Sequence, residues 1–247
     1  MTKRRADQIE GFPPTPLPPS FTATRESLRA LACYVVAPAR KARTGRIGLR
    51  PTDDGFGTPR FADGSQLVVR GDRLVWEPGD AITVTTLRAA AIFAGVDLSP
   101  DPGVGHDLPP YDPDADLGIE RDASFSIGAW YRFGQTVLDS LSATLPPGSV
   151  TDAQLWPEHF DLALVVDLPG GARVNVGFSP GDGFHDGPYA YVGPQDSPGL
   201  SGGYWNAPFG AYLGYTDLES AADPHAVAAE FITVGLAALA SAGARRG

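Results

Sequence analysis

Apolar residues along the chain follow two periods, and the change from one to the other predicts the secondary structure. Some segments carry apolar residues three or four positions apart, which is the spacing of one face of an α-helix. Between them, apolar and polar residues alternate, as in strands that cover a core with one face. The pattern predicts an α+β fold, in which a mixed, mostly antiparallel sheet packs with about four helices near residues 24–38, 86–95, 124–145 and 224–242.

Turn and capping residues bound these elements. The first helix should end before Pro38, because proline lacks the amide hydrogen that a helix interior needs. Gly71-Asp72 separates two alternating segments and predicts a two-residue hairpin turn. The last helix begins at Asp223-Pro224 and is apolar on nearly all sides, so it should be packed on more than one side. Strands and helices occur in both halves of the chain, which also allows two pseudo-similar lobes.

Proline content separates the start of the chain from the rest. Five prolines occur between Phe12 and Pro19, and each fixes its own φ and disfavours helix in the residue before it. We expect residues 1–20 to form an extended, Pro-rich N-terminal strap. Residues 21–247 should form a single α+β domain.

Composition and charge narrow the classes of function. The chain is 43% hydrophobic, which is enough for a substantial core, and its net charge of -10 argues against nucleic-acid binding. The charge is uneven, since residues 1–50 sum to +7 and the remainder to -17. The basic segment is either an anion site built from Arg40, Lys41, Arg43 and Arg46 or a surface that pairs with the acidic remainder.

The cysteine content and the length of the apolar segments indicate the cellular compartment. The single cysteine, Cys33, excludes an internal disulfide, and its apolar helical context suggests a small buried residue rather than a nucleophile. No apolar stretch follows Lys3-Arg4-Arg5, and the run Phe231–Ala242 is too short to span a bilayer. We therefore expect an acidic cytoplasmic protein with no signal peptide and no membrane partner.

Residues 155–192 hold the densest group of polar, aromatic and turn residues. Within this stretch, Pro169-Gly170-Gly171 separates two apolar strands, and the length of the turn determines which residues face each other. A two-residue turn would mix apolar and polar side chains on each face. A three-residue turn pairs Leu168 with Ala172 and Val166 with Val174, so we predict that register.

The same register predicts a polar face. It sets Asp161 opposite Ser179 and His159 near Asp182, and His159 and Asp161 share this face because they are two apart in a strand. These residues and their neighbours are candidates for ligand binding. The candidate residues are Trp156, Glu158, His159, Asp161, Ser179, Asp182, His185, Tyr189 and Tyr191.

Several chemistries could use these residues. Imidazole and carboxylate groups suit Zn, Mn or Fe, although the spacing matches no established ligand motif. Ser179 precedes a proline and lacks the sharp turn of a serine nucleophile, whereas Gly177–Gly183 could present amides to an anion. In a purely structural alternative, the polar residues cap turns and the aromatic residues pack. The weak metal candidates are His159, Asp161, Asp182 and His185.

Several segments together resemble a family of bacterial proteins that is common in actinobacteria and has no assigned activity. They are Thr24–Leu28 with the helix that follows, Trp156–Leu162, Phe178–Asp182, Pro188–Tyr191 and Ala222–Pro224. The resemblance covers most of the chain from about residue 24 onward. Its most specific part is the Trp-Pro-x-His-Phe-Asp-Leu strand. It implies one continuous domain and a cytosolic setting, and it assigns no catalytic role.

These observations lead to one functional prediction and two alternatives. We predict a cytosolic small-molecule-binding or interaction protein with a pocket at the 155–192 hairpin. The first alternative is a metal-assisted, hydrolase-like enzyme that uses His159, Asp161 and Asp182. The second is a structural partner protein without pocket chemistry. The sequence specifies no catalytic residue, no cofactor, no particular small molecule or protein partner, and no oligomeric state.

Overall fold

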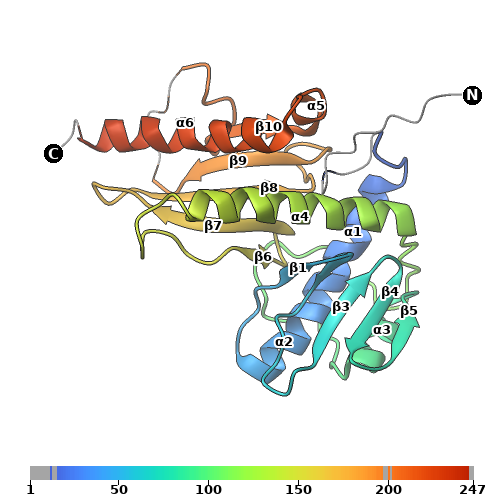
Figure 1. Cartoon of the computed structure of the whole chain (residues 1–247). Coiled ribbons are helices and arrows are strands. Elements are labelled where there is room, and N and C mark those ends of the chain that lie inside the picture. Colours follow the sequence, from blue (N-terminus) through green and yellow to red (C-terminus); the bar gives the residue numbers. More distant parts are fainter. Residues whose placement is uncertain (1–11, 13–15, 197–199, 201, 245–247) are drawn as a thin grey trace, which may run out of the picture. The chain divides into compact units, whose positions relative to one another are not determined.

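The computed structural model describes residues 12, 16–196, 200 and 202–244, and the chain forms two compact units (Figure 1). Each unit combines antiparallel strands with helices, which confirms the predicted α+β fold. Helix α4 (Arg121–Ser142) begins in unit 2 and ends in unit 1. Most of the predicted N-terminal strap lies outside the described residues, and its role stays a prediction. Unit 1 comprises Met1–Phe12, Phe133–Ala153 and Leu162–Gly247; unit 2 comprises Pro13–Arg132 and Gln154–Asp161.

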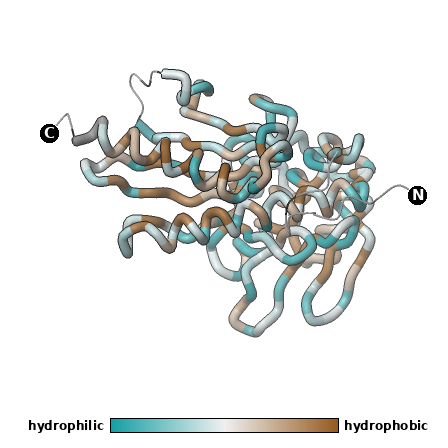
Figure 2. Tube along the Cα trace, turned by 45° about the horizontal axis from the view of Figure 1, so that its top comes forward, coloured by the Kyte–Doolittle hydropathy of each residue, from teal (hydrophilic) through white to brown (hydrophobic). Residues whose placement is uncertain are grey.

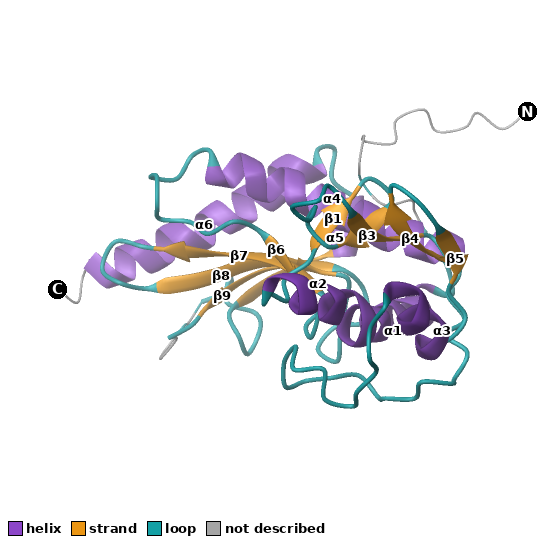
Figure 3. Cartoon of the chain, turned by 90° about the horizontal axis from the view of Figure 1, so that it is seen from below, coloured by secondary structure: helices purple, strands orange, loops and turns teal. Residues whose placement is uncertain are grey.

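Unit 2 contains a five-stranded antiparallel sheet in the order β1-β2-β3-β4-β5. Figure 3 shows α1, α2 and α3 on one side of these strands and the start of α4 on the other. Burial agrees, because the first four residues of β3 are all buried and both faces of a strand must be covered for that. The elements are α1 (Phe21–Leu31), η1 (Ala32–Val36), α2 (Ala37–Thr44), β1 (Arg50–Thr52), β2 (Gly55–Gly57), β3 (Gln66–Arg70), β4 (Arg73–Glu77), β5 (Ala81–Thr83), α3 (Leu87–Ala94) and β6 (Gln154–Trp156).

The first helix continues past Pro38, so the prediction that it ends there is wrong. The segment η1 is a π-helix, and α2 follows it directly and ends at Gly45, whose φ is 71°. A π-turn shifts the hydrogen-bond ladder by one residue, which accommodates the ring and the missing amide hydrogen of Pro38. As a result, Arg40 and Lys41 lie in an ordered helix.

Unit 1 contains antiparallel strands in the order β10-β9-β8-β7. The predicted three-residue turn is confirmed, because the Leu168 amide donates to the Ala172 carbonyl over 2.8 Å and Val166 pairs with Val174. In unit 2, the pairing of Arg70 with Arg73 likewise confirms the two-residue turn at Gly71-Asp72. The elements of unit 1, besides the end of α4, are β7 (Asp161–Asp167), β8 (Arg173–Ser179), β9 (Tyr189–Pro194), β10 (Ala211–Gly214), α5 (Tyr215–Glu219) and α6 (Pro224–Ala244).

Helix α4 covers one face of the unit 1 sheet, and α6 lies beside it. The rings of Phe133 on α4 and Phe178 on β8 meet edge to face at 5.7 Å. Gly134 permits this approach, because an added Cβ would lie 2.7 Å from Cγ of Phe178. Ser140 of α4 and His225 of α6 are 3.3 Å apart, from Oγ to Nε2. The core of unit 1 therefore lies between this sheet face and the helices, and the opposite face is lined by the alternate residues of β9.

Helix α6 packs on one side only, which corrects the prediction that it is packed on more than one side. Val234 is 48% exposed. In the 18-residue segment Pro224–Ser241, which has a mean hydropathy of 1.3, 28% of the residues are buried. The apolar character of the helix comes largely from alanine, whose small side chain exposes little apolar area in water. Apolar residues recur along this helix near the C-terminus (Figure 2). Length and composition alone would allow α6 to cross a membrane.

Candidate functional site

The candidate residues that the sequence predicts belong to both units. The unit 1 residues come together around one loop and one sheet face, whereas those of unit 2 lie in or directly beside a turn. Unit 2 holds Trp156, Glu158, His159 and Asp161; unit 1 holds Ser179, Asp182, His185, Tyr189 and Tyr191.

Residues 157–160 form a turn, so the prediction that His159 and Asp161 share a strand face is wrong. The backbone reverses at Phe160, whose φ is 52°, and β7 begins one residue later. His159 is exposed and Asp161 is buried. The positive φ costs about 1–2 kcal/mol, and burial of the Phe160 ring against Phe56 and Tyr131 offsets that cost, since a buried phenylalanine contributes about 1.5–3 kcal/mol.

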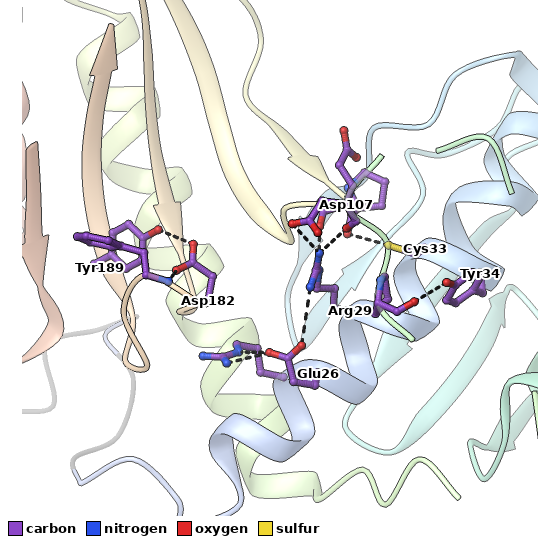
Figure 4. Close-up of polar contacts among 12 residues, drawn as sticks. Glu26, Arg29, Cys33, Tyr34, Asp107, Asp182 and Tyr189 are labelled. Carbon is purple, nitrogen blue, oxygen red and sulfur yellow. Dashed lines mark hydrogen bonds and ion pairs between the residues drawn. The ribbon is translucent and has the colours of Figure 1, made fainter. Parts of the chain in front are cut away.

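Two side chains of the first helix hold this turn in place (Figure 4). Arg29 Nε donates to the carbonyl oxygen of Glu158 over 2.8 Å, and its guanidinium also pairs with Asp107. Cys33 Sγ donates to the carbonyl oxygen of Pro157 over 3.1 Å. Burial, with smaller contributions from Glu158 and Asp107, raises the pKa of the Cys33 thiol to about 12. Cys33 is therefore a buried structural thiol and not an activated nucleophile.

In unit 1, Asp182 organises the loop that follows β8 (Figure 4). Its Oδ1 accepts from the amides of Phe184 and His185, at 2.8 Å and 3.2 Å. Its Oδ2 accepts from the Tyr189 hydroxyl at 2.7 Å, and its own amide donates to the His185 carbonyl at 2.9 Å. Both carboxylate oxygens therefore accept hydrogen bonds that hold the loop against β9.

The loop presents its rings beside those of β9 and β10. Tyr189 and Tyr191 alternate along β9, and Tyr212 of β10 pairs with Tyr191, so all three lie on the face opposite α4 and α6. The centroid of the Phe184 ring lies 5.2 Å from that of Tyr212 and 4.9 Å from that of Phe209. We call this set the aromatic surface; it comprises Phe184, His185, Tyr189, Tyr191, Phe209 and Tyr212.

The aromatic surface is graded from a buried base to an exposed rim. Tyr189 is 4% exposed and Phe184 is 41% exposed, with Tyr191 and Tyr212 between them. Gly177 allows Tyr191 to lie flat against the sheet, because an added Cβ would lie 2.6 Å from the Tyr191 hydroxyl. This gradation is typical of a binding surface, in which buried rings fix the positions of exposed ones.

Three members of this surface were not predicted from the sequence. Tyr189, Tyr191 and His185 were candidates, but Phe184, Phe209 and Tyr212 were not. The alternation of Tyr189 and Tyr191 is visible in the sequence. The pairing of β9 with β10 across an intervening loop gives no local signal, and it alone brings Tyr212 beside Tyr191.

The electrostatic character of unit 1 is strongly acidic. Among its described residues, Arg173 is the one Lys or Arg side chain, whereas Asp and Glu number ten. Arg173 is itself paired with Asp167, at 2.9 Å from Nε to Oδ1. The field around the aromatic surface therefore attracts cations.

The four weak metal candidates, which are His159, Asp161, Asp182 and His185, do not form a metal-binding cluster. Within the described residues, no group of three or more His, Cys, Asp or Glu side chains is placed to hold a metal ion. Asp182 is hydrogen-bonded to Tyr189 and to loop amides, and His185 Nδ1 lies 2.8 Å from the Gly187 carbonyl oxygen. These contacts indicate that Asp182 and His185 stabilise the loop conformation.

No family model, no curated protein and no solved structure matches the chain. The resemblance to an actinobacterial family stays an expectation from the sequence.

Proposed function

We propose that this is a binding protein without catalytic chemistry, and that its aromatic surface receives cationic side chains of a partner protein. The observation that carries the proposal is the cluster of six rings on the sheet face opposite the helices, in a unit whose described residues include ten acidic side chains and one arginine. The proposal specifies the ligand class for the interaction protein predicted from the sequence. It places the binding site at β9, β10 and their loops and not at the β7–β8 hairpin.

The rings have the properties of an interface that binds arginine or lysine. Aromatic side chains are enriched at protein interfaces, and the face of a ring attracts a guanidinium within about 6 Å of its centroid. Phe184 and Tyr212 meet edge to face, with an interplanar angle of 87°, so a cation would bind against a ring face that is open to solvent. The hydroxyl of Tyr212 has no hydrogen-bond partner in the described part of the chain and can accept from a bound donor.

The negative charge of unit 1 also favours a cationic partner. Opposite charge on two partners accelerates their encounter and suppresses like-charged competitors. Arg173 is already paired with Asp167, so among the described residues of unit 1 no other Lys or Arg balances the negative charge. A basic partner protein is the class of ligand that matches both the rings and the charge. A small apolar ligand would use only the rings.

A catalytic use of the same residues has less support. Asp182 and His185, which would be the acid and base, hold the loop through hydrogen bonds of 2.7–3.2 Å. We propose no cofactor. We also propose a bacterial, cytoplasmic setting, which the resemblance suggests and the lone buried thiol of Cys33 supports, since such a thiol needs no oxidising compartment.

A peptide titration tests the proposal. The probe is a glycine-spaced oligoarginine peptide, and the control is the same peptide with citrulline, a neutral isostere of arginine. We expect the arginine peptide to bind the full chain about tenfold more tightly at low salt, and added salt to weaken that binding. Phe184→Ala and Tyr212→Ala should each weaken it by about fivefold or more.

Ile92 provides the matched control, because it is 77% exposed in α3 of unit 2 and belongs to no ring cluster. Ile92→Ala should leave the affinity for the arginine peptide unchanged. Equal affinity for the arginine and citrulline peptides would overturn the proposal, as would equal losses in the Phe184→Ala and Ile92→Ala variants.

A further inference from the structure

Arg40 is a buried cation that has no counter-ion among the residues that the structure describes. The residue lies in α2 of unit 2 and is 8% exposed. Its Nη1 is shielded from solvent and has no hydrogen-bond partner among the described residues. A buried charge is costly unless it is paired or hydrogen-bonded, so an arginine in this state indicates a missing anionic partner.

Two more arginines lie on the segment that follows α2. Arg50 begins β1, Arg46 precedes it by four residues, and both side chains are exposed. Leu49 forms an isolated antiparallel bridge with Leu155, with hydrogen bonds of 2.7 Å and 2.9 Å, and both of these leucines are buried. The bridge fixes the stretch so that Arg50, the next residue, points away from the buried side chain of Leu49.

Gln154 joins them from the neighbouring strand. Because Leu155 is opposite Leu49 in an antiparallel bridge, Gln154 stands opposite Arg50 on the same face. Gly48 forms the base of this group. A Cβ added at Gly48 would lie 2.2 Å from Gln154 Oε1 and 3.3 Å from Arg40 Nη1. The Gln154 amide and the Arg40 guanidinium therefore converge above the one residue that has no side chain.

No described acidic side chain pairs with the positive charge of this group. Among the ion pairs of the described residues, none includes Arg40, Arg46 or Arg50. Burial lowers the pKa of the Arg40 guanidinium, and the charges of Arg46 and Arg50 lower it further, so the guanidiniums act on one another without a screening carboxylate.

The remaining basic residues of the segment have other partners, which corrects the composition of the anion site considered from the sequence. Arg43 pairs with Asp63 and stacks on the Phe61 ring, 3.9 Å from its centroid. Lys41 donates to the Gly103 carbonyl oxygen over 2.8 Å. Lys41 and Arg43 are therefore engaged elsewhere, whereas Arg50, which was not considered, joins the group.

We propose that Arg40, Arg46, Arg50 and the Gln154 amide form a binding site for a phosphate group, either inorganic phosphate or the phosphate of a small monoester. Planar guanidinium groups bind phosphate oxygens in pairs, and several of them together favour a dianion over a singly charged carboxylate. Gly48 leaves room for the Gln154 amide beside Arg40. The site lies in unit 2 and is independent of the aromatic surface of unit 1.

Calorimetric titration of the full chain with inorganic phosphate tests this site, and sodium chloride at matched ionic strength serves as the reference. We expect phosphate and phenyl phosphate to bind and to raise the melting temperature, and acetate to do neither. Tighter binding of phenyl phosphate would indicate an organic monoester as the natural ligand, and equal binding would indicate free phosphate. Arg50→Gln should weaken binding by about tenfold or more.

Arg43→Gln is the matched control, because it removes one positive charge from the same segment without touching the site. It should change the affinity for phosphate by less than about twofold. Arg40→Met should abolish the effect of phosphate while keeping or raising the melting temperature in chloride, since it removes an unpaired buried charge. The proposal is refuted if phosphate stabilises no more than chloride does, or if Arg43→Gln and Arg50→Gln weaken binding equally.

Discussion

The hydroxyl of Tyr131 donates a hydrogen bond of 2.7 Å to the carbonyl oxygen of Phe160, and the two rings meet edge to face at 5.6 Å. Phe160 is the residue at which the backbone takes a positive φ before β7, so a buried tyrosine of α4 holds the reversal in place. The Tyr131 hydroxyl remains a donor over a wide pH range, because burial raises its pKa well above the usual value.

Tyr131→Phe should lower the free energy of unfolding by about 1–3 kcal/mol, because it leaves the Phe160 carbonyl buried without a donor. Urea unfolding followed by far-UV circular dichroism measures this loss. Tyr111→Phe is the control, since the hydroxyl of Tyr111 has no partner among the described residues, and we expect a change below about 0.5 kcal/mol. Equal effects of the two substitutions would contradict this role of Tyr131.

Gly134→Ala should destabilise the protein, although alanine is normally the better residue in a helix. The added Cβ would lie 2.7 Å from Cγ of the fully buried Phe178, and overpacking of this kind costs about 1–3 kcal/mol. Phe178→Leu in the Gly134→Ala background should recover part of the loss. Gly203→Ala, in an exposed loop where a Cβ meets no atom within 4 Å, should leave the melting temperature unchanged.

The stability contributed by Cys33 should decline at alkaline pH. Burial raises the pKa of the folded thiol from its ordinary value of 9.0 to about 12, so the unfolded chain loses this proton first. The contribution is complete below pH 9, and it declines as the pH rises toward 12. Between pH 7 and pH 10, wild type should lose about 1 kcal/mol more stability in urea unfolding than Cys33→Ala does. Parallel pH profiles of the two proteins would show that the thiol is not shielded.

Asp182→Ala should loosen the loop that carries Phe184 without unfolding unit 1. The substitution removes the acceptor of the Phe184 and His185 amides and the partner of the Tyr189 hydroxyl. We expect hydrogen exchange at these two amides to accelerate by about tenfold or more, while the amides of β8 keep their rates. Asp116→Ala, which removes the acceptor of the Gly118 amide in unit 2, is the control and should affect exchange only near Gly118.

The sequence alone determined those features whose cause lies within a few residues. The alternation of apolar residues and the length of the Pro169-Gly170-Gly171 turn were sufficient to predict the β7–β8 register, because a slip of one residue would move every apolar side chain to the other face. The two-residue turn at Gly71-Asp72 and the burial of Cys33 followed in the same way from local pattern.

Only the tertiary structure decided where distant segments meet. The reversal of the backbone at Phe160 depends on contacts with Phe56 and Tyr131. The first helix continues through Pro38 because of a π-turn, which local helix propensity does not predict. The aromatic surface needs the pairing of Tyr191 with Tyr212, and the arginine group needs the bridge between Leu49 and Leu155.

The physical reason for this division is the range of the interactions involved. Periodicity and turn chemistry act between neighbours along the chain, so they can be read in the sequence. Burial, cation pairing and cross-strand contact act between residues that folding brings together from far apart. Arg40 illustrates the difference: its positive charge is evident from the sequence, whereas its burial, with no counter-ion among the described residues, is a property of the folded unit.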